Sequence, residues 1–292
     1  MSRLAFCFFF LLLSVFVRAE NLGALPEVQF DRLSDRSLSA LGQRALAVRP
    51  ADWKHAETDH FIYHFFDRPT ASAVAVESEF YYRVIAKELG KDTANWERKC
   101  HVFIFEQEAD WTQFQSGVGL DPWTGGIHSE GTLFFRRNPG WRANNQTLPH
   151  EIAHLVLHRF FGNGIPLWLH EGFAEFAASR CRAAFYRARG FDAKPRASAV
   201  IEQDYIPLAD FVALAAYPRT QESVMAFYAE SEKLTRFLSK TDKDAFLRFL
   251  ETMSKGAQFE SAMRAEFGRT FYDIAALEKE FKPYAISAMA KD

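Results

Sequence analysis

The string HEIAH at residues 150–154 constrains the fold of this chain more than any other feature. Its apolar surroundings, with a proline near the start and glycines after the end, predict one helix over Leu148–Phe161. Positions four apart on a helix differ by only about 40° and lie about 6 Å apart along its axis. His150 and His154 therefore project from one face, close enough for their imidazoles to bind one metal ion.

A second helix is expected soon after the first, in PLWLHEGFAE, which begins at Pro166. Two helices joined by four or five residues tend to pack antiparallel. Glu171, near the start of the second helix, can then meet His150 and His154. Two histidines and one carboxylate leave the fourth position of a tetrahedral zinc ion open for water, which is typical of catalytic and not of structural zinc.

Three further residues complete the predicted centre. Glu151 is turned about 100° from His150, so its carboxylate can reach a water on the metal without being a ligand. Glu175 lies one turn beyond Glu171 on the same face, where it can accept the free ring N–H of a ligand histidine. Gly172 costs about 1 kcal/mol of helix propensity. We interpret this glycine as allowing backbone or substrate to approach the metal closely.

HEIAH followed after sixteen residues by EGFAE resembles the gluzincin metallopeptidases of the MA clan, and is most similar to the exported bacterial group described as peptidase MA-like. The resemblance implies an α+β fold with a thermolysin-like zincin lobe, built from a small mixed sheet and the HExxH helix, followed by a mainly helical C-terminal lobe. It also implies Zn²⁺ held by His150, His154 and Glu171, with Glu151 as general base and Glu175 beside a ligand.

Two more features are implied by the resemblance. The segment FYAES resembles the tyrosine-bearing helix of this group, which implies that the hydroxyl of Tyr228 stabilises the oxyanion of the reaction. A core aromatic in a chain with 30 Phe residues is the alternative reading of Tyr228. Clan members often bind an extended peptide along an edge strand, and Gly125–Phe135 is the segment in which we expect that strand.

Departures from related families narrow the resemblance. A metzincin would need glycine and histidine where this chain has Leu157 and Phe160, so that class is excluded. The GxMEN motif of aminopeptidases does not occur, which leaves amino-terminal exopeptidase specificity without support. His158 lies about 12 Å along the helix from His150, too far to share one ion, and we expect it at the surface or partly packed. His170 adjoins Glu171 but points about 100° away from it, and contact with substrate is the alternative role for this side chain.

Strand patterns come first and helical patterns follow. Strands are expected in DHFIYHFF from Asp59, over Cys100–Glu106 and over Thr132–Arg136, with helices over 71–89 and 107–115. After the last strand the pattern is almost entirely helical. This order favours an α+β fold without βαβ repetition.

The first residues have the character of a signal peptide. A short positive start precedes an apolar run over Leu4–Val17, and small residues precede a cleavage point after Ala19. The run is shorter than the about 20 residues that span a bilayer. We therefore expect export to the periplasm or the extracellular space with no stable membrane span, although an uncleaved anchor is the alternative. The predicted segments are a signal peptide (1–19), an N-terminal extension (20–50), a zincin catalytic lobe (51–190) and a helical C-terminal lobe (191–292).

Two cysteines remain after cleavage. Cys100 and Cys181 could form one disulfide in an oxidising compartment, or they could be two separate buried thiols. Neither has a CxxC partner, which argues against a cysteine–zinc site.

Charge and motif together limit the function. The 35 basic and 37 acidic residues give a net charge of −2, without the basic excess typical of nucleic-acid binding. We predict an exported zinc metallopeptidase that hydrolyses peptide or protein substrates by activated water and a glutamate base. The alternatives are a catalytically silent, zinc-stabilised scaffold or peptide-binding module, and a zinc hydrolase acting on a non-peptide amide.

Overall fold

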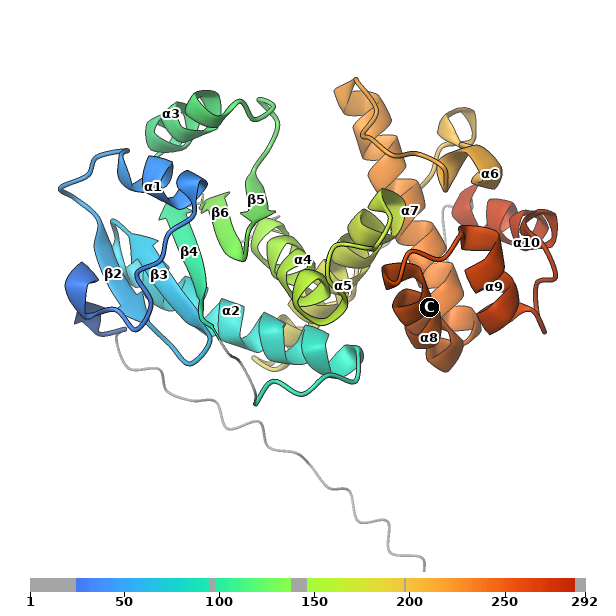
Figure 1. The fold of residues 1–292 in the computed structure, drawn as a ribbon, viewed down its shortest axis with the longest axis horizontal. Coiled ribbons are helices and arrows are strands. Elements are labelled where there is room, and N and C mark those ends of the chain that lie inside the picture. Colours follow the sequence, from blue (N-terminus) through green and yellow to red (C-terminus); the bar gives the residue numbers. More distant parts are fainter. Residues whose placement is uncertain (1–24, 95–97, 138–145, 197, 287–292) are drawn as a thin grey trace, which may run out of the picture.

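The computed structural model describes residues 25–94, 98–137, 146–196 and 198–286. The signal peptide predicted over residues 1–19 lies outside these ranges. A mixed sheet forms one half of the molecule, helices of the C-terminal part form the other, and two helices lie between them (Figure 1). The fold is therefore mixed α/β and rich in helix. A thermolysin-like arrangement of the lobes stays a prediction.

The sheet has six strands, of which the central three are parallel and the outer ones antiparallel. Helices α2 (Arg68–Glu88) and α3 (Glu108–Val118) lie in the connections between the parallel strands. The prediction of no βαβ units was wrong here, because parallel neighbours require such a crossover. The strand order is β1 (Glu27–Val28), β2 (Lys54–Glu57), β3 (Phe61–Phe65), β4 (Cys100–Phe105), β6 (Thr132–Arg136) and β5 (Gly126–Ser129).

Both faces of the sheet are buried, as the near-continuous apolar strands require. Val102 and Ile104 of β4 belong to the core that includes α2 and α4 (Thr147–Phe161), whereas Phe103 and Phe105 face a second core with α3. Helix α1 (Ala40–Leu46) contributes to this second core. Part of the predicted N-terminal extension thus packs on the sheet, through β1 and α1. The domain boundaries themselves stay predictions.

The C-terminal half consists of helices around α7 (Gln221–Thr241), which packs along α5 (Leu167–Arg187). Helix α5 in turn packs against α4, so α4 and α5 join the two halves (Figure 1). The other elements of this half are α6 (Leu208–Phe211), α8 (Lys243–Ser254), α9 (Phe259–Phe267), α10 (Ile274–Ile286) and a 3₁₀ turn (Glu202–Asp204); another 3₁₀ turn, Phe30–Arg32, follows β1.

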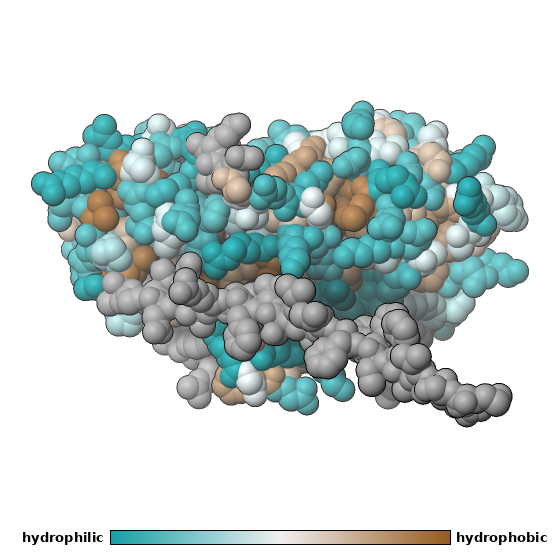
Figure 2. All heavy atoms as spheres, turned by 90° about the horizontal axis from the view of Figure 1, so that it is seen from below, coloured by the Kyte–Doolittle hydropathy of each residue, from teal (hydrophilic) through white to brown (hydrophobic). Residues whose placement is uncertain are grey.

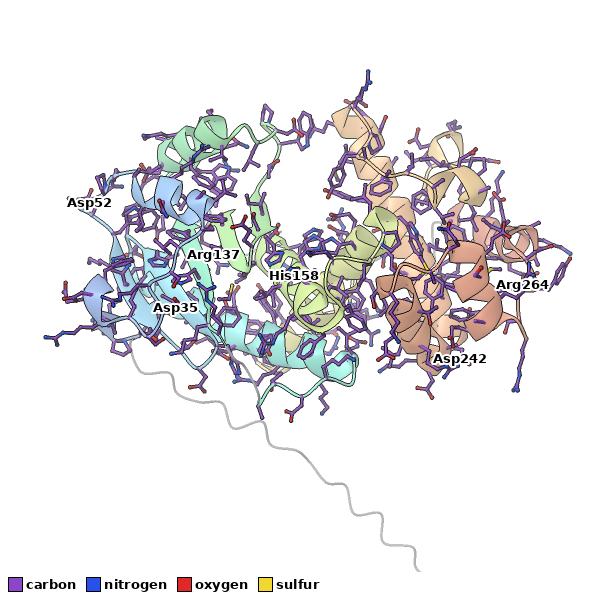
Figure 3. The ribbon with its side chains drawn as sticks, viewed as in Figure 1. Asp35, Asp52, Arg137, His158, Asp242 and Arg264 are labelled. Carbon is purple, nitrogen blue, oxygen red and sulfur yellow. The ribbon has the colours of Figure 1, made fainter. Side chains whose placement is uncertain are left out.

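A buried ion pair links the residue after β6 to α2. Arg137, which follows β6 (Figure 3), donates to the carboxylate of Glu77 at 2.8 and 3.1 Å. Both side chains are buried. Breaking such a pair leaves an uncompensated buried charge, so the pair fixes where the chain leaves the sheet on its way to α4.

Cys100 in β4 and Cys181 in α5 are separate buried thiols, the second of the two arrangements that the sequence left open. Within the described ranges, no helix combines the length and apolar character that a membrane crossing needs. On the face seen from below, the visible described residues are mostly hydrophilic, with apolar residues in small scattered areas (Figure 2).

Candidate metal centre

The two helices that carry HEIAH and EGFAE meet at these motifs because a tight turn joins them. Helix α4 ends at Gly162, whose φ of 70° lies in the left-handed region that favours glycine. Helix α5 begins after Pro166, a residue suited to the entry of a helix. Leu148 and Ile152 of α4 are fully buried in the main core, which turns the motif face of α4 toward α5. The side chains of both motifs therefore face each other.

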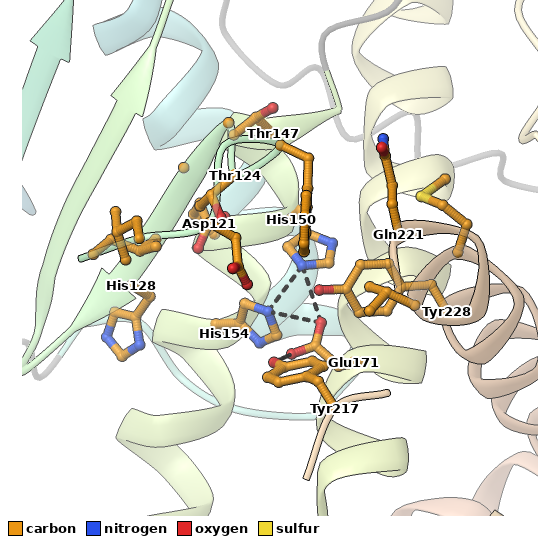
Figure 4. A pocket seen from close by; sticks show the side chains of 18 of the residues that line it. Asp121, Thr124, His128, Thr147, His150, His154, Glu171, Tyr217, Gln221 and Tyr228 are labelled. Atoms are coloured by element: carbon orange, nitrogen blue, oxygen red, sulfur yellow. Dashed lines mark hydrogen bonds and ion pairs between the residues drawn. The ribbon is translucent and has the colours of Figure 1, made fainter. Parts of the chain in front are cut away.

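Three side-chain atoms converge between these helices (Figure 4). Nε2 of His150 and Nε2 of His154 are 2.9 Å apart, and Oε2 of Glu171 lies 3.3 Å from the first and 3.4 Å from the second. Among the described residues, this is the only group of three or more His, Cys, Asp or Glu side chains with convergent ligand atoms. The structure thus brings together the three ligands that the sequence predicted.

The donor set fits a zinc ion. Oε2 of Glu171 is buried and accepts no hydrogen bond, although it is a carboxylate oxygen that favours a donor or a cation. Burial acts to raise the pKa of Glu171, but His154 and His150 hold it well below its usual range, so the carboxylate is charged. Two imidazole nitrogens and one carboxylate oxygen are ligands typical of catalytic zinc.

Glu175, which the sequence predicted beside a ligand histidine, lies against His150. Its Oε1 lies 3.0 Å from Nδ1 of His150, on the side of the ring opposite to the converging Nε2. Burial opposes ionisation of Glu175, yet the adjacent ring of His150 lowers its pKa. A carboxylate in this position fixes the tautomer that presents Nε2 to a metal.

Glu151 lines the same cavity as the convergent ligands and is only 6% exposed. Burial raises the pKa of its carboxyl to about 7, while the charge of nearby His150 acts in the opposite direction. A carboxyl whose pKa lies near neutrality can both accept and return a proton.

Tyr228 extends from α7 into the cavity, and its hydroxyl points toward the three convergent side chains (Figure 4). Its ring centroid lies 6.2 Å from that of His150. Burial, and after it the charge of Glu171, raises the pKa of this phenol, so it carries its proton at neutral pH and can donate a hydrogen bond. Tyr228 is also packed against the main core, so its role in the reaction stays a prediction.

The cavity has a volume of about 540 Å³ and two walls. One wall is the loop that begins at Gly119 and continues into β5. The other wall is the segment Tyr217–Tyr228, and α4 and α5 form the floor. Strand β5 is the last strand in the sheet order, within the segment where an edge strand was expected. Its binding of peptide stays a prediction.

Comparison with known families agrees with this geometry. A family model described as the Peptidase MA superfamily matches residues 84–287, which is more than half of the chain and includes both motif helices and Tyr228. The chain belongs to the peptidase MA superfamily. Membership indicates a peptidase, with peptides or proteins as its substrate class, and the peptidases of this clan are typically metal-dependent. No curated protein matches the sequence.

Two other histidines of this superfamily member lie near the centre without joining the ligand set. The ring of His170 stacks on that of His154, with centroids 4.2 Å apart. His158 lies further along α4 (Figure 3), half-buried, with its ring 5.5 Å from that of His128. The partly packed position of His158 agrees with the sequence prediction.

Sequence reasoning missed Tyr217, which contacts the ligand carboxylate directly. Its hydroxyl donates to Oε1 of Glu171 at 2.5 Å. The residue lies in the irregular segment before α7, where neither helical nor strand periodicity marks a side chain as inward-facing. Its only signal in the sequence is an aromatic residue before a proline, which does not distinguish it from an ordinary loop residue.

Proposed function

We propose that this chain is an exported zinc-dependent peptidase of the gluzincin type, which hydrolyses peptide bonds. The observation that carries the proposal is the convergence of two imidazole nitrogens and one buried, otherwise unpartnered carboxylate oxygen at 2.9–3.4 Å. The superfamily match supports the peptidase activity. The zinc, the role of each residue and the export are our own inferences from the ligand chemistry and the sequence.

The proposed roles follow from the positions of the side chains. His150, His154 and Glu171 would hold Zn²⁺, which when bound would polarise the scissile carbonyl and activate water. Glu151 takes the proton of the attacking water and later delivers it to the leaving amine. Glu175 orients the ring of His150 through its contact with Nδ1.

Substrate binding is assigned to the two walls of the cavity. The exposed edge of β5 offers backbone groups to an extended peptide, which would add to the sheet beside the metal ligands. Tyr228, on the opposite wall, donates its hydroxyl proton to the oxyanion that develops on the scissile carbonyl. The peptide would therefore lie between the strand and α7.

Export is proposed from the sequence alone. The apolar run over Leu4–Val17 and the small residues before position 20 have the pattern of a cleaved signal. N-terminal sequencing of the protein secreted by its host would test this, with cleavage after Ala19 as the expected result. An intact N-terminus on a membrane-bound protein would favour the uncleaved anchor instead.

The test of the peptidase assignment is Glu151→Gln, which removes the base while keeping size and shape. We expect wild-type-like zinc binding and a loss of kcat of about 100- to 10,000-fold on a peptide library. Glu260→Gln, an exposed substitution in α9, is the matched control and should keep full activity. Full activity in Glu151→Gln would refute the base assignment. Stoichiometric zinc without cleavage by the wild type would favour the non-enzymatic scaffold.

A further inference from the structure

The two oxygens of the Glu171 carboxylate have different partners. Oε2 faces the two histidines at 3.3 and 3.4 Å, whereas Oε1 accepts a hydrogen bond from the hydroxyl of Tyr217 at 2.5 Å. Figure 4 shows Tyr217 on the side of the carboxylate away from the histidine pair. A carboxylate can bind zinc through one oxygen or both, so a donor on Oε1 affects which of the two modes is adopted.

The hydrogen bond resists rotation of the carboxylate. To bring Oε1 to the metal as well, Glu171 would have to turn and break its bond to Tyr217, which is a charge-assisted bond of the stronger kind. Binding through Oε2 alone keeps the coordination number low and leaves room for water or the substrate carbonyl. A phenol O–H can donate to this oxygen, whereas a carboxylate in the same place would repel Glu171.

Tyr217 also contacts the residue proposed to stabilise the oxyanion. The rings of Tyr217 and Tyr228 meet edge to face, with centroids 6.2 Å apart. Tyr217 therefore contacts both Glu171 and Tyr228. The segment between α6 and α7 supplies this link, although neither motif contains it.

We propose that Tyr217 is a positioning residue, which holds the carboxylate of Glu171 so that Oε2 alone faces the two histidines and is the oxygen available to the metal. This inference rests on the proposed function, because it assumes a zinc ion at the convergent ligands. It assigns to a residue outside both sequence motifs the task of setting the coordination number.

A purely structural role for Tyr217 does not fit its surroundings. The side chain is 47% exposed at the mouth of the cavity, so it contributes less to the core than a buried tyrosine would. Its ring still packs edge to face on that of Phe227, with centroids 6.2 Å apart. Phenylalanine at position 217 can keep this ring contact, and the substitution removes only the hydroxyl.

The test is Tyr217→Phe, with Tyr272→Phe as the matched control, since Tyr272 is 71% exposed and does not line the cavity. Zinc affinity is measured by competition with a chromophoric chelator, and coordination by the visible absorption of the cobalt(II)-substituted protein. We expect zinc binding about 10- to 100-fold weaker in Tyr217→Phe. We also expect weaker cobalt absorption, because five-coordinate cobalt absorbs less than four-coordinate cobalt. Tyr272→Phe should match the wild type in both measurements.

The outcomes separate this inference from the proposed function. Zinc affinity and cobalt absorption equal to those of the wild type in Tyr217→Phe would overturn the positioning role, while the zinc site itself would stand. A wild-type protein that binds neither zinc nor cobalt would overturn the proposed function and this inference together. The unfolding midpoint of the metal-free variant, expected to equal that of the metal-free wild type, shows that the fold is intact.

Discussion

A β-carbon at Gly172 would lie 2.2 Å from the carbonyl oxygen of Ser231, which means that α5 and α7 touch backbone to backbone beside the ligand Glu171. The hydroxyl of Thr235 would lie 2.4 Å from the same β-carbon. The sequence suggested that this glycine lets backbone or substrate approach the metal. The structure shows instead that its closest neighbours belong to α7, the helix that carries Tyr228.

Gly172→Ala should therefore destabilise the protein, because the added methyl group meets backbone that cannot move aside. We expect a loss of about 1–3 kcal/mol in the free energy of unfolding, measured by urea denaturation. Gly117→Ala in α3 is the control, since a β-carbon there meets nothing within 4 Å. The control should be neutral or slightly stabilising. Equal effects of the two substitutions would refute the close packing of α5 on α7.

Glu230→Gln in α7 should stabilise the protein at neutral and basic pH. Glu230 is fully buried, and burial raises the pKa of its carboxyl to about 8, with the charge of Glu278 acting in the same direction. Between pH 4.5 and 8 the folded state holds a proton that the unfolded state has lost, so stability falls as the pH rises through this window. Glutamine is neutral throughout and can still accept from the backbone N–H of Ile206.

The expected gain for Glu230→Gln is up to about 3 kcal/mol at pH 7 and close to zero at pH 4, where both side chains are neutral. Urea midpoints at several pH values measure it. A gain of the same size at pH 4 and pH 7 would show that the charge of Glu230 is not the cause.

Two buried histidines and one half-buried histidine on neighbouring strands should make the protein sensitive to acid. Nδ1 of His64 lies 2.8 Å from Nδ1 of His55, and its Nε2 lies 2.9 Å from Nδ1 of His101. Burial lowers the pKa of His55 and of His101 to about 4, and that of His64 well below its usual value. Below pH 6.5 the histidines bind protons in the unfolded state but not in the folded state. The free energy of unfolding therefore decreases as the pH falls from 6.5 to about 4.

His101→Asn should reduce this loss of stability in acid. The side-chain amide of asparagine can take the place of Nδ1 of His101 beside Nε2 of His64, and the amide does not titrate. Nearby Asp35 acts to raise the pKa of His101, while Arg98 acts to lower it, so both are kept unchanged in the variant. The measurement is the difference in unfolding free energy between pH 7 and pH 5. The same difference in variant and wild type would mean that His101 contributes nothing to the acid sensitivity.

The parts of this molecule that the sequence predicted are those with strong local periodicity. Helix α4 was expected over Leu148–Phe161 and occupies Thr147–Phe161, because its apolar spacing and its glycine stop act within a few residues. The apolar run Cys100–Phe105 is a buried strand for the same reason. The meeting of Glu171 with the two histidines was predictable because a short turn leaves adjacent helices little choice of packing.

The parts that escaped prediction depend on contacts between distant segments. The parallel pairing of β3 with β4 follows from how α2 packs on the sheet, which no single window of sequence reveals. Tyr217 reaches Glu171 only because the segment before α7 folds back over the cavity. Buried ionisable side chains such as Glu230 are equally hard to predict, since polar residues in an amphipathic helix are expected to face solvent.

The central claim is that His150, His154 and Glu171 hold one zinc ion, and metal analysis of the purified protein tests it most directly. The wild type and the control Glu260→Gln should contain one zinc per chain after dialysis against metal-free buffer. Glu171→Gln should bind zinc more than about 100-fold more weakly, because it removes a charged ligand and not merely a neighbour of one. A wild type without zinc, or unchanged affinity in Glu171→Gln, would contradict the account.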